Sequence, residues 1–300
     1  MREFIAPRYW STWLGIGFLW IVTKLPRFIR HALAGWLASL AWKFNKKRRL
    51  IVETNLSICF PEKTETEQII LGRKHFQAMA RSFLDMGLVW FASDKNLLKV
   101  VRLEGWEHYE SARATGKNII LHVAHCAGLE FGAMAVGSRE PGLGPYNAVK
   151  NKLVDYFISK GRMRFGNKVF ARNDGMLAYV RALKKGKLLY TLTDEDHGPE
   201  LSVIAPLFNH PKATLPIVGR LAKLANAAVL PTMTCYDSEK NQYVTTIFPA
   251  LTHFPGETLE QDAESLNQAL EQMILFAPEE FMWTLRIFRT QVDGRRVYRY

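Results

Sequence analysis

The chain has 300 residues, of which 48% are hydrophobic, and its 40 lysines and arginines against 28 aspartates and glutamates give a formal net charge of +12. This length is ample for a buried core and fits one α/β domain with an appendage, and the charge predicts an anionic partner: nucleic acid, anionic lipid or an acidic protein. Three scattered cysteines, Cys59, Cys126 and Cys235, exclude a disulfide framework and a zinc ribbon and favour a reducing, cytoplasmic environment.

The first predicted element is a membrane-anchoring helix. The run "YWSTWLGIGFLWIVT" at residues 9–23 has no charged side chain and carries three tryptophans. At ~1.5 Å per residue it covers about 22 Å, so it falls short of a hydrocarbon core of roughly 30 Å, and a transmembrane helix would need flanking residues or a thinned bilayer. We therefore expect anchoring. A signal peptide is the alternative, because "ALA" at 32–34 resembles a cleavage site, but Lys24, Arg27 and Arg30 separate it from the apolar run.

Basic residues follow this segment more than they precede it. Three between positions 24 and 30, and then "KFNKKRR" at 43–49, outnumber the two before it, which predicts that the rest of the chain lies on the cytoplasmic side. The stretch 31–44 has apolar residues at helical spacing and suits an interfacial helix or a core helix equally well. We accordingly divide the chain into a membrane anchor with an interfacial helix, residues 1–45, and one larger domain, residues 46–300.

The larger domain alternates between predicted strands and predicted helices. The strands are expected at 118–123, 168–172, 187–193, 227–236 and 243–248, and the helices at 152–163, 174–184, 214–226 and, with a capping box of Thr258 and Gln261, from 258 to about 277. No repeat or long linker interrupts the domain. This alternation predicts an α/β fold with a mixed, mostly parallel central sheet flanked by helices.

A candidate site lies in "NIILHVAHCAGLEFGAM", residues 118–134. A strand through Val123, a turn of small residues and a helix beginning near Leu129 would place His125 beyond the carboxyl end of the strand, where open α/β sheets bind ligands. Glu130 would then lie in the first turn of the helix, where its carboxylate can hold one imidazole nitrogen and leave the other as a general base. The alternative is that His125 and Glu130 are ordinary polar residues at a strand-to-helix junction.

The neighbouring residues favour structural interpretations. His122 falls inside the strand and is expected to be a buried, hydrogen-bonded histidine. A zinc pair of His122 and His125 lacks a third and a fourth ligand at conventional spacing, so no metal site is predicted there. A Cys126 nucleophile is disfavoured, because adjacent residues of an extended chain point in opposite directions.

The motif "HCAGLE" at 125–130 resembles the His-x4-Asp/Glu motif of glycerolipid-type acyltransferases. Further stretches are similar to the late acyltransferases of lipid A biosynthesis, the lauroyl and myristoyl transferases of Gram-negative bacteria: "GRMRFG" (161–166), "ARNDGM" (171–176), "TDEDHGPELSVIAPLF" (193–208), "ATLPI" (213–217) and "PEEFMWTLRIFRT" (278–290). The chain departs from this family where "TDED" replaces Pro-Asp-Gln-Asp, and where Leu285 and Ile287 replace a histidine and an arginine.

The resemblance implies a membrane-bound enzyme at the cytoplasmic face of the inner membrane, N-terminally anchored, and makes 46–300 the acyltransferase domain. It implies transfer of a fatty acyl group from acyl carrier protein to the hydroxyl of a 3-hydroxyacyl chain on a lipid A precursor, with no metal, no other cofactor and no nucleic acid. His125 would be the general base, oriented by Glu130. Either Arg162 or a backbone N–H near Gly128 and Leu129 would stabilise the oxyanion.

The segment 150–187 holds eleven lysines and arginines against two aspartates, a surface that would attract an acidic carrier protein and a phosphorylated acceptor. The resemblance falls on Arg162, Arg164 and Arg172, which become the substrate-binding candidates. For Arg162 the alternative is a structural ion pair with Glu130.

The acidic triplet at 194–196 keeps other functions open. Asp194 and Asp196 are substrate-binding candidates on the resemblance, but they would also fit the Asp-x-Asp of a metal-dependent, membrane-associated glycosyltransferase, or cap backbone amides in a turn before Pro199. A non-enzymatic protein that binds anionic lipid or nucleic acid through its basic face is the remaining alternative.

Overall fold

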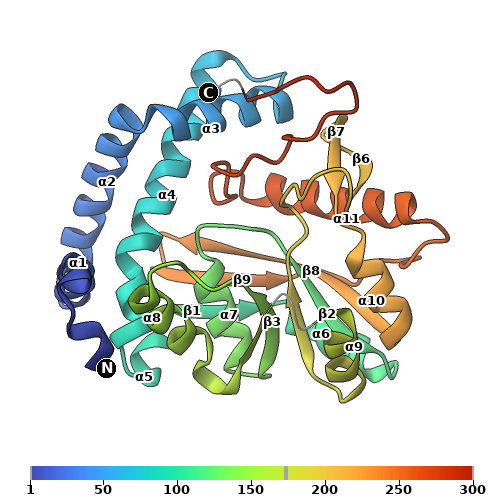
Figure 1. Ribbon diagram of the computed structural model, residues 1–300, viewed down its shortest axis with the longest axis horizontal. Coiled ribbons are helices and arrows are strands. Elements are labelled where there is room, and N and C mark those ends of the chain that lie inside the picture. Colours follow the sequence, from blue (N-terminus) through green and yellow to red (C-terminus); the bar gives the residue numbers. More distant parts are fainter. Residues whose placement is uncertain (1, 172–174, 299–300) are drawn as a thin grey trace.

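The computed structural model describes residues 2–171 and 175–298 and is built around a seven-stranded sheet (Figure 1). The strand order is β1-β9-β8-β2-β5-β3-β4, and every neighbouring pair is parallel apart from β8 and β9. The strands are β1 (Val101–Glu104), β2 (Asn118–Val123), β3 (Gly142–Tyr146), β4 (Lys168–Ala171), β5 (Leu188–Thr191), β8 (Ala227–Asp237) and β9 (Gln242–Ile247). The predicted mixed, mostly parallel α/β sheet is therefore confirmed. A separate antiparallel hairpin consists of β6 (Val203–Leu207) and β7 (His210–Thr214).

Helices flank the sheet on both faces. They are α1 (Trp10–Val22), α2 (Arg27–Phe44), α3 (Lys46–Cys59), α4 (Glu65–Phe91), α5 (Asp94–Leu97), α6 (Trp106–Ala114), α7 (Leu129–Gly137), α8 (Lys152–Arg162), α9 (Met176–Lys184), α10 (Ile217–Ala225) and α11 (Leu259–Phe276), with short 3-10 helices at 2–5, 7–9 and 164–166. The capping box of Thr258 and Gln261 opens α11 as predicted.

The central strand β2 is buried on both faces, as its unbroken apolar sequence requires in a parallel sheet. Its side chains alternate between two layers: Ile120 packs with residues of α9 and α10, whereas Leu121 packs with residues of α6 and α7. Because β2 is held between β8 and β5, the loop that follows Val123 emerges at the middle of the sheet.

The N-terminal helices form a layer beside the sheet, in which α1 and α2 pack along α4 (Figure 1). The predicted helix at 9–23 exists as α1, but it has only 13 residues. Among the helices of the described residues, none is both long enough and apolar enough to cross a bilayer, so the transmembrane helix is not supported. The proposed boundary at residue 45 coincides with Asn45, which ends α2 and caps α3, and the division into two domains stays a prediction.

The segment after α11 returns across the molecule toward α3 (Figure 1). The buried Asn55 of α3 donates from Nδ2 to the carbonyl oxygens of Trp283 and Leu285, each at 2.7 Å, and accepts a hydrogen bond from the Tyr298 hydroxyl. Ile287, which replaces the arginine of the resembled family, is fully buried in the hydrophobic cluster that also contains Trp283 and Tyr298. An apolar residue therefore suits this position in the chain.

Candidate active site

The loop between β2 and α7 carries the candidate base. β2 ends at Val123 and α7 begins at Leu129, so His125 lies beyond the carboxyl end of the central strand, as predicted. Figure 1 shows this loop at the edge of the sheet that faces the C-terminal segment.

The C-terminal segment fixes the backbone of this loop. Met282 N donates to the His125 carbonyl oxygen at 2.9 Å, and Ala127 N donates to the Glu280 carbonyl oxygen at 2.8 Å. Between them, Cys126 and Phe281 form an antiparallel bridge. His125 is thus presented by a loop whose backbone is hydrogen-bonded on both sides of it.

The partner of the His125 ring is Asp194, which follows β5. Nδ1 forms a close hydrogen bond and ion pair with Asp194 Oδ1, and the His125 backbone N–H donates to Oδ2 of the same carboxylate at 2.6 Å. The predicted orientation of the ring by Glu130 is therefore wrong. β5 lies next to β2 in the parallel sheet, so the ends of both strands bring these residues together, whereas Glu130 is held by another side chain.

The electrostatics of the pair favour its ionised form. Burial alone would raise the pKa of Asp194, which has no exposed surface, but attraction to His125 and the hydrogen bonds from His125 hold that pKa below its ordinary value. Burial alone would lower the pKa of His125, yet the charge of Asp194 and its hydrogen bond raise it above the ordinary value. The ring consequently has increased basicity, with Nε2 on the side away from Asp194 and 3.9 Å from Glu195 Oε1.

Glu130 is paired with Arg162, the last residue of α8. Arg162 Nε lies 3.0 Å from each Glu130 carboxylate oxygen, and Nη2 makes a further close contact with Oε1. The guanidinium carbon lies 5.1 Å from the centre of the Tyr146 ring. Our alternative interpretation of Arg162, an ion pair with Glu130, is thus confirmed, and the pair fixes a positive charge beside the candidate base.

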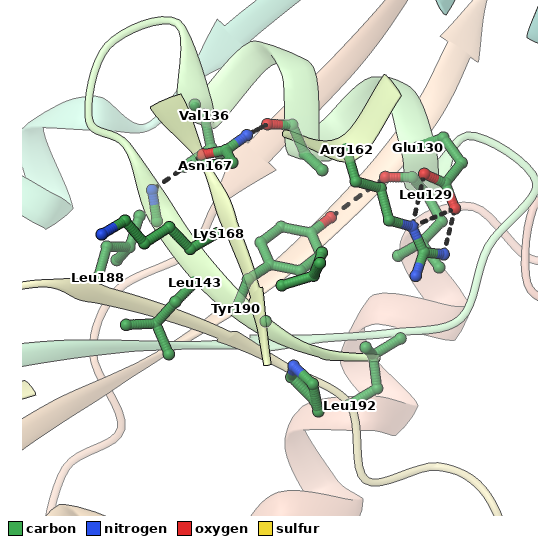
Figure 2. A pocket seen from close by; sticks show the side chains of 16 residues that line it. Leu129, Glu130, Val136, Leu143, Arg162, Asn167, Lys168, Leu188, Tyr190 and Leu192 are labelled. Carbon is green, nitrogen blue, oxygen red and sulfur yellow. Dashed lines mark hydrogen bonds and ion pairs between the residues drawn. The ribbon is translucent and has the colours of Figure 1, made fainter. Parts of the chain in front are cut away.

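Two cavities meet at Arg162 and Leu129. The larger, about 1240 Å³, contains His125, Glu195 and His197 in its wall. The smaller, about 610 Å³, extends between α7 and the strands β3 and β5 and has mainly apolar walls (Figure 2). It is lined by Leu129, Ala133, Val136, Leu143, Leu188, Tyr190 and Leu192 among others. An apolar recess therefore opens next to the charged groups.

Arg164 and Arg172 are the other two arginines that were predicted to bind substrate. Arg164 donates to the carbonyl oxygens of Val89 and Ala92, at 2.8 and 2.9 Å, and pairs with Asp94. Its guanidinium is therefore bound to residues at the end of α4 and in α5, and its role as a substrate ligand stays a prediction. Arg172 lies outside the described residues.

The two aspartates of the acidic triplet have separate partners. Asp196 accepts from the backbone N–H and the hydroxyl of Thr290, at 2.6 and 2.8 Å, and from Gly198 N at 2.9 Å. These contacts confirm the turn-capping alternative for Asp196, and its role as a substrate ligand stays a prediction. Asp194 and Asp196 do not form the joint Asp-x-Asp site of a glycosyltransferase. Within the described ranges, no group of three histidines, cysteines or carboxylates has the geometry to hold a metal.

His122 and Cys126 are buried without exposed surface. His122 Nε2 is hydrogen-bonded to the Thr193 hydroxyl at 2.9 Å, and burial lowers the pKa of its ring to about 4, so it is the predicted structural histidine. Burial raises the pKa of the Cys126 thiol to about 12, which keeps it protonated near neutral pH and unsuited to nucleophilic attack.

Sequence reasoning missed the pairing of Asp194 with His125 and the contribution of Met282 and Glu280 to the loop. A signal existed for the first: "TDED" directly follows a predicted strand, so its carboxylates belong at the same sheet edge as His125. The strand order that makes β5 the neighbour of β2 could not be read from the sequence.

Comparison with known proteins identifies the family of the chain. A family model described as bacterial lipid A biosynthesis acyltransferase matches residues 1–290. The chain is 35% identical to the lipid A biosynthesis lauroyltransferase of Escherichia coli K12, over 97% of this chain and 95% of that protein. It is 36% identical to a lipid A biosynthesis acyltransferase of Haemophilus influenzae, over 99% and 93% of the two chains. It is 30% identical to the palmitoleoyltransferase of E. coli K12, over 98% and 95%. The chain therefore belongs to the bacterial lipid A biosynthesis acyltransferase family.

Proposed function

We propose that this acyltransferase moves a fatty acyl group from the thioester of acyl carrier protein to the hydroxyl of a 3-hydroxyacyl chain on a lipid A precursor. The observation that carries the proposal is the pair of half-buried His125, at the wall of the larger cavity, with buried Asp194, beside an apolar recess. Membership of an acyltransferase family decides against the glycosyltransferase and non-enzymatic alternatives.

The proposed reaction begins with proton transfer from the acceptor hydroxyl to Nε2 of His125. Asp194 stabilises the imidazolium that forms, and its hydrogen bond to Nδ1 keeps the second nitrogen available as the acceptor. The alkoxide attacks the thioester carbonyl and forms a tetrahedral intermediate. Collapse of this intermediate forms the new ester and breaks the carbon–sulfur bond, and the imidazolium returns its proton to the departing thiolate. This sequence requires no metal and no further cofactor.

Arg162 is the proposed donor to the oxyanion of that intermediate or to a substrate phosphate. The backbone N–H of Leu129, a competing donor in our sequence interpretation, already donates to the Cys126 carbonyl oxygen at 3.2 Å. Arg162 uses Nε and Nη2 on Glu130, which leaves Nη1 as its further donor at the junction of the two cavities. Glu130 is then a positioning residue that orients the arginine.

The smaller cavity is the proposed site of the acyl chain (Figure 2). Its lining follows β5 and the residue after it through Leu188, Tyr190 and Leu192, and the four residue steps from Leu188 to Leu192 span about 13 Å of extended chain. Figure 2 shows Arg162 and Glu130 at one part of this lining and Lys168 at another. A thioester carbonyl near Arg162 could therefore direct its alkyl chain away from the charged pair into the apolar recess.

We further propose that the enzyme works at the cytoplasmic face of the inner membrane. Trp10, Leu14, Phe18 and Ile21 lie on one stripe of α1 and are 62%, 76%, 44% and 55% exposed. Phe28, Trp36 and Phe44 are exposed apolar side chains of α2, and lysines and arginines lie at both ends of that helix. Apolar side chains flanked by cations are typical of helices that lie in the membrane interface.

The test is mass spectrometry of a lipid A precursor after incubation with fatty acyl carrier protein and the detergent-purified chain. Wild type should add one acyl mass, His125→Ala should reduce the rate at least 100-fold, and the matched variant His108→Ala, on α6 and outside both cavities, should retain full activity. Equal activity of wild type and His125→Ala would refute the proposed base. No transfer by wild type from any of several carrier-bound donors would refute the substrate assignment.

A further inference from the structure

Lys212 is a lysine without exposed surface in β7, close to the candidate active site. Its Nζ lies 3.2 Å from the Thr214 hydroxyl oxygen, 3.3 Å from the Ala213 carbonyl oxygen and 3.4 Å from the Thr193 carbonyl oxygen. All three of these acceptors are neutral. The ammonium therefore has hydrogen-bond acceptors for its three donors, but among the residues that the structure describes no carboxylate forms an ion pair with it.

A buried ammonium is costly unless nearby charges offset its desolvation. Burial lowers the pKa of Lys212 to about 8, and the charges of Asp194 and Asp196 oppose that change. His122 of β2 also lies within the field of Lys212, and its pKa is lowered in part by that charge. The charged and titratable groups around Lys212 thus come from β2 and from the loop after β5.

Thr193 connects this lysine to the catalytic pair. Its carbonyl oxygen is an acceptor for Lys212, its hydroxyl is bonded to His122, and the next residue along the chain is Asp194. Asp194 in turn holds His125 through both the ring and the backbone N–H. Contacts therefore run without a break from Lys212 through Thr193 and Asp194 to His125.

We propose that Lys212 is a positioning residue for the general base: its buried ammonium holds the peptide before Asp194 and supplies the positive charge that keeps the Asp194 carboxylate ionised, and through Asp194 it sets the basicity of His125. This inference rests on the proposed role of His125. It assigns to Lys212 no contact with the substrate.

Removal of this charge should change the apparent pKa of His125 in a predictable direction. The His125–Asp194 pair carries a net charge of −1 when the ring is neutral and zero after one proton is added. A nearby positive charge favours the state with −1, so its removal makes the pair bind a proton more readily. Among the described residues, Asp194, Glu195 and Arg162 are the charged groups that act directly on His125, and Lys212 acts on Asp194. His197 lies 3.8 Å from Glu195 and is a further titratable side chain on this side of the ring.

An NMR titration of the ring of His125 tests this inference, in detergent-purified, full-length protein with labelled histidine and with the signal assigned by its loss in His125→Gln. Lys212→Met should raise the apparent pKa of His125 by about one unit. Lys212→Gln, which keeps a donor for Thr193 without the charge, should do the same and serves if Lys212→Met does not fold. Thr214→Val alters the buried surroundings of Lys212 but keeps its charge, so His125 in this variant should titrate as in wild type.

The acid limb of the transfer rate should move to higher pH by the same amount in both Lys212 variants. Folded Lys212 variants with a wild-type His125 titration would overturn the inference and leave Lys212 a purely structural residue. A shift of equal size in Thr214→Val would also overturn it, because the cause would then be packing and not charge. If the titration shifts as expected but wild type shows no acyl transfer, the proposed function fails and the role of Lys212 stands.

Discussion

Asp194→Asn is the substitution that tests the active-site geometry most directly. An asparagine fills the same space and retains one oxygen that can accept the His125 backbone N–H, but its amide N–H group competes for Nδ1 and favours the ring tautomer with a protonated Nε2. That tautomer cannot accept the proton of the acceptor hydroxyl. The imidazolium also loses its charged partner in a site where Asp194 has no exposed surface.

The magnitude follows from the two lost contributions. A hydrogen bond between charged groups contributes about 1.5–3 kcal/mol, and the unfavourable tautomer adds to this loss in the transition state. Because 1.36 kcal/mol corresponds to tenfold in rate, we expect kcat to fall by a factor on the order of 10² to 10³. The folded structure should persist, since shape and one hydrogen bond are retained.

The pH dependence of the transfer rate tests the role of Asp194 independently. The charge and hydrogen bond of Asp194 raise the pKa of His125, and the active form of a general base is the neutral ring. Activity of wild type should therefore rise with pH through a midpoint above the ordinary histidine value. In Asp194→Asn that midpoint should move to lower pH, opposite to the movement expected for Lys212→Met.

The assay is the rate of acyl transfer between pH 5 and 9, with Glu130→Gln as the matched control because Glu130 is the carboxylate that the sequence predicted as the partner of His125. Glu130→Gln should slow transfer by loosening Arg162, yet it should leave the midpoint of the acid limb unchanged. If Glu130→Gln moves the midpoint and Asp194→Asn does not, the assignment of Asp194 as the partner of the base is incorrect.

Three further predictions concern the surroundings of the pair. Arg162→Lys keeps the charge but loses the fork that binds Glu130, so kcat should fall about 10- to 100-fold, and an unchanged kcat would exclude Arg162 as the oxyanion donor. Ala133→Val and Ala133→Phe progressively fill the smaller cavity, so competition between carrier-bound donors should shift stepwise toward shorter chains; an unaltered product ratio would place the acyl chain elsewhere. Arg164→Ala removes contacts to α4 and α5 and should lower the free energy of unfolding by about 1–3 kcal/mol with kcat retained, which thermal denaturation and the transfer assay would check together.

A fourth prediction concerns the exposed surface of α1. Phe18→Ser combined with Leu14→Ser removes two of the exposed apolar side chains and should reduce co-sedimentation with vesicles that contain anionic lipid. Transfer in detergent micelles should be unaffected, because neither residue lines a cavity of the site. Wild-type vesicle binding by the double variant would refute the proposed membrane surface.

Local signals in the sequence sufficed for most of the sheet. The apolar runs at 118–123 and 243–248 agree with β2 and β9 to within a residue. The central strand β2 needs continuous burial, whereas β9 alternates between buried and half-buried residues, as a strand with one more exposed face does. The helix start at Leu129 was also correct, since small residues before it mark the turn. β3, with the sequence "GLGPY", was missed, because two glycines and a proline obscure its strand character.

The partners within the site could not be found by the same reasoning. The spacing of His125 and Glu130 is a local feature, and it suggested a local hydrogen bond. In the folded chain each finds a partner far away in sequence: Asp194 after β5 for His125, and Arg162 at the end of α8 for Glu130. These pairings depend on strand order and helix placement, which single-sequence patterns do not encode.

The two ion pairs explain why the histidine and the glutamate of one motif can have different tasks. A single Glu130 that both oriented His125 and held Arg162 would place a base and a cation on the same carboxylate, and the cation would weaken the base. Separate carboxylates avoid this conflict: Asp194 raises the pKa of the ring, while Glu130 fixes a positive charge where the oxyanion is expected. The backbone bonds of Met282 and Glu280 to the loop between these groups then keep the proposed base and the proposed oxyanion donor in one geometry through the reaction.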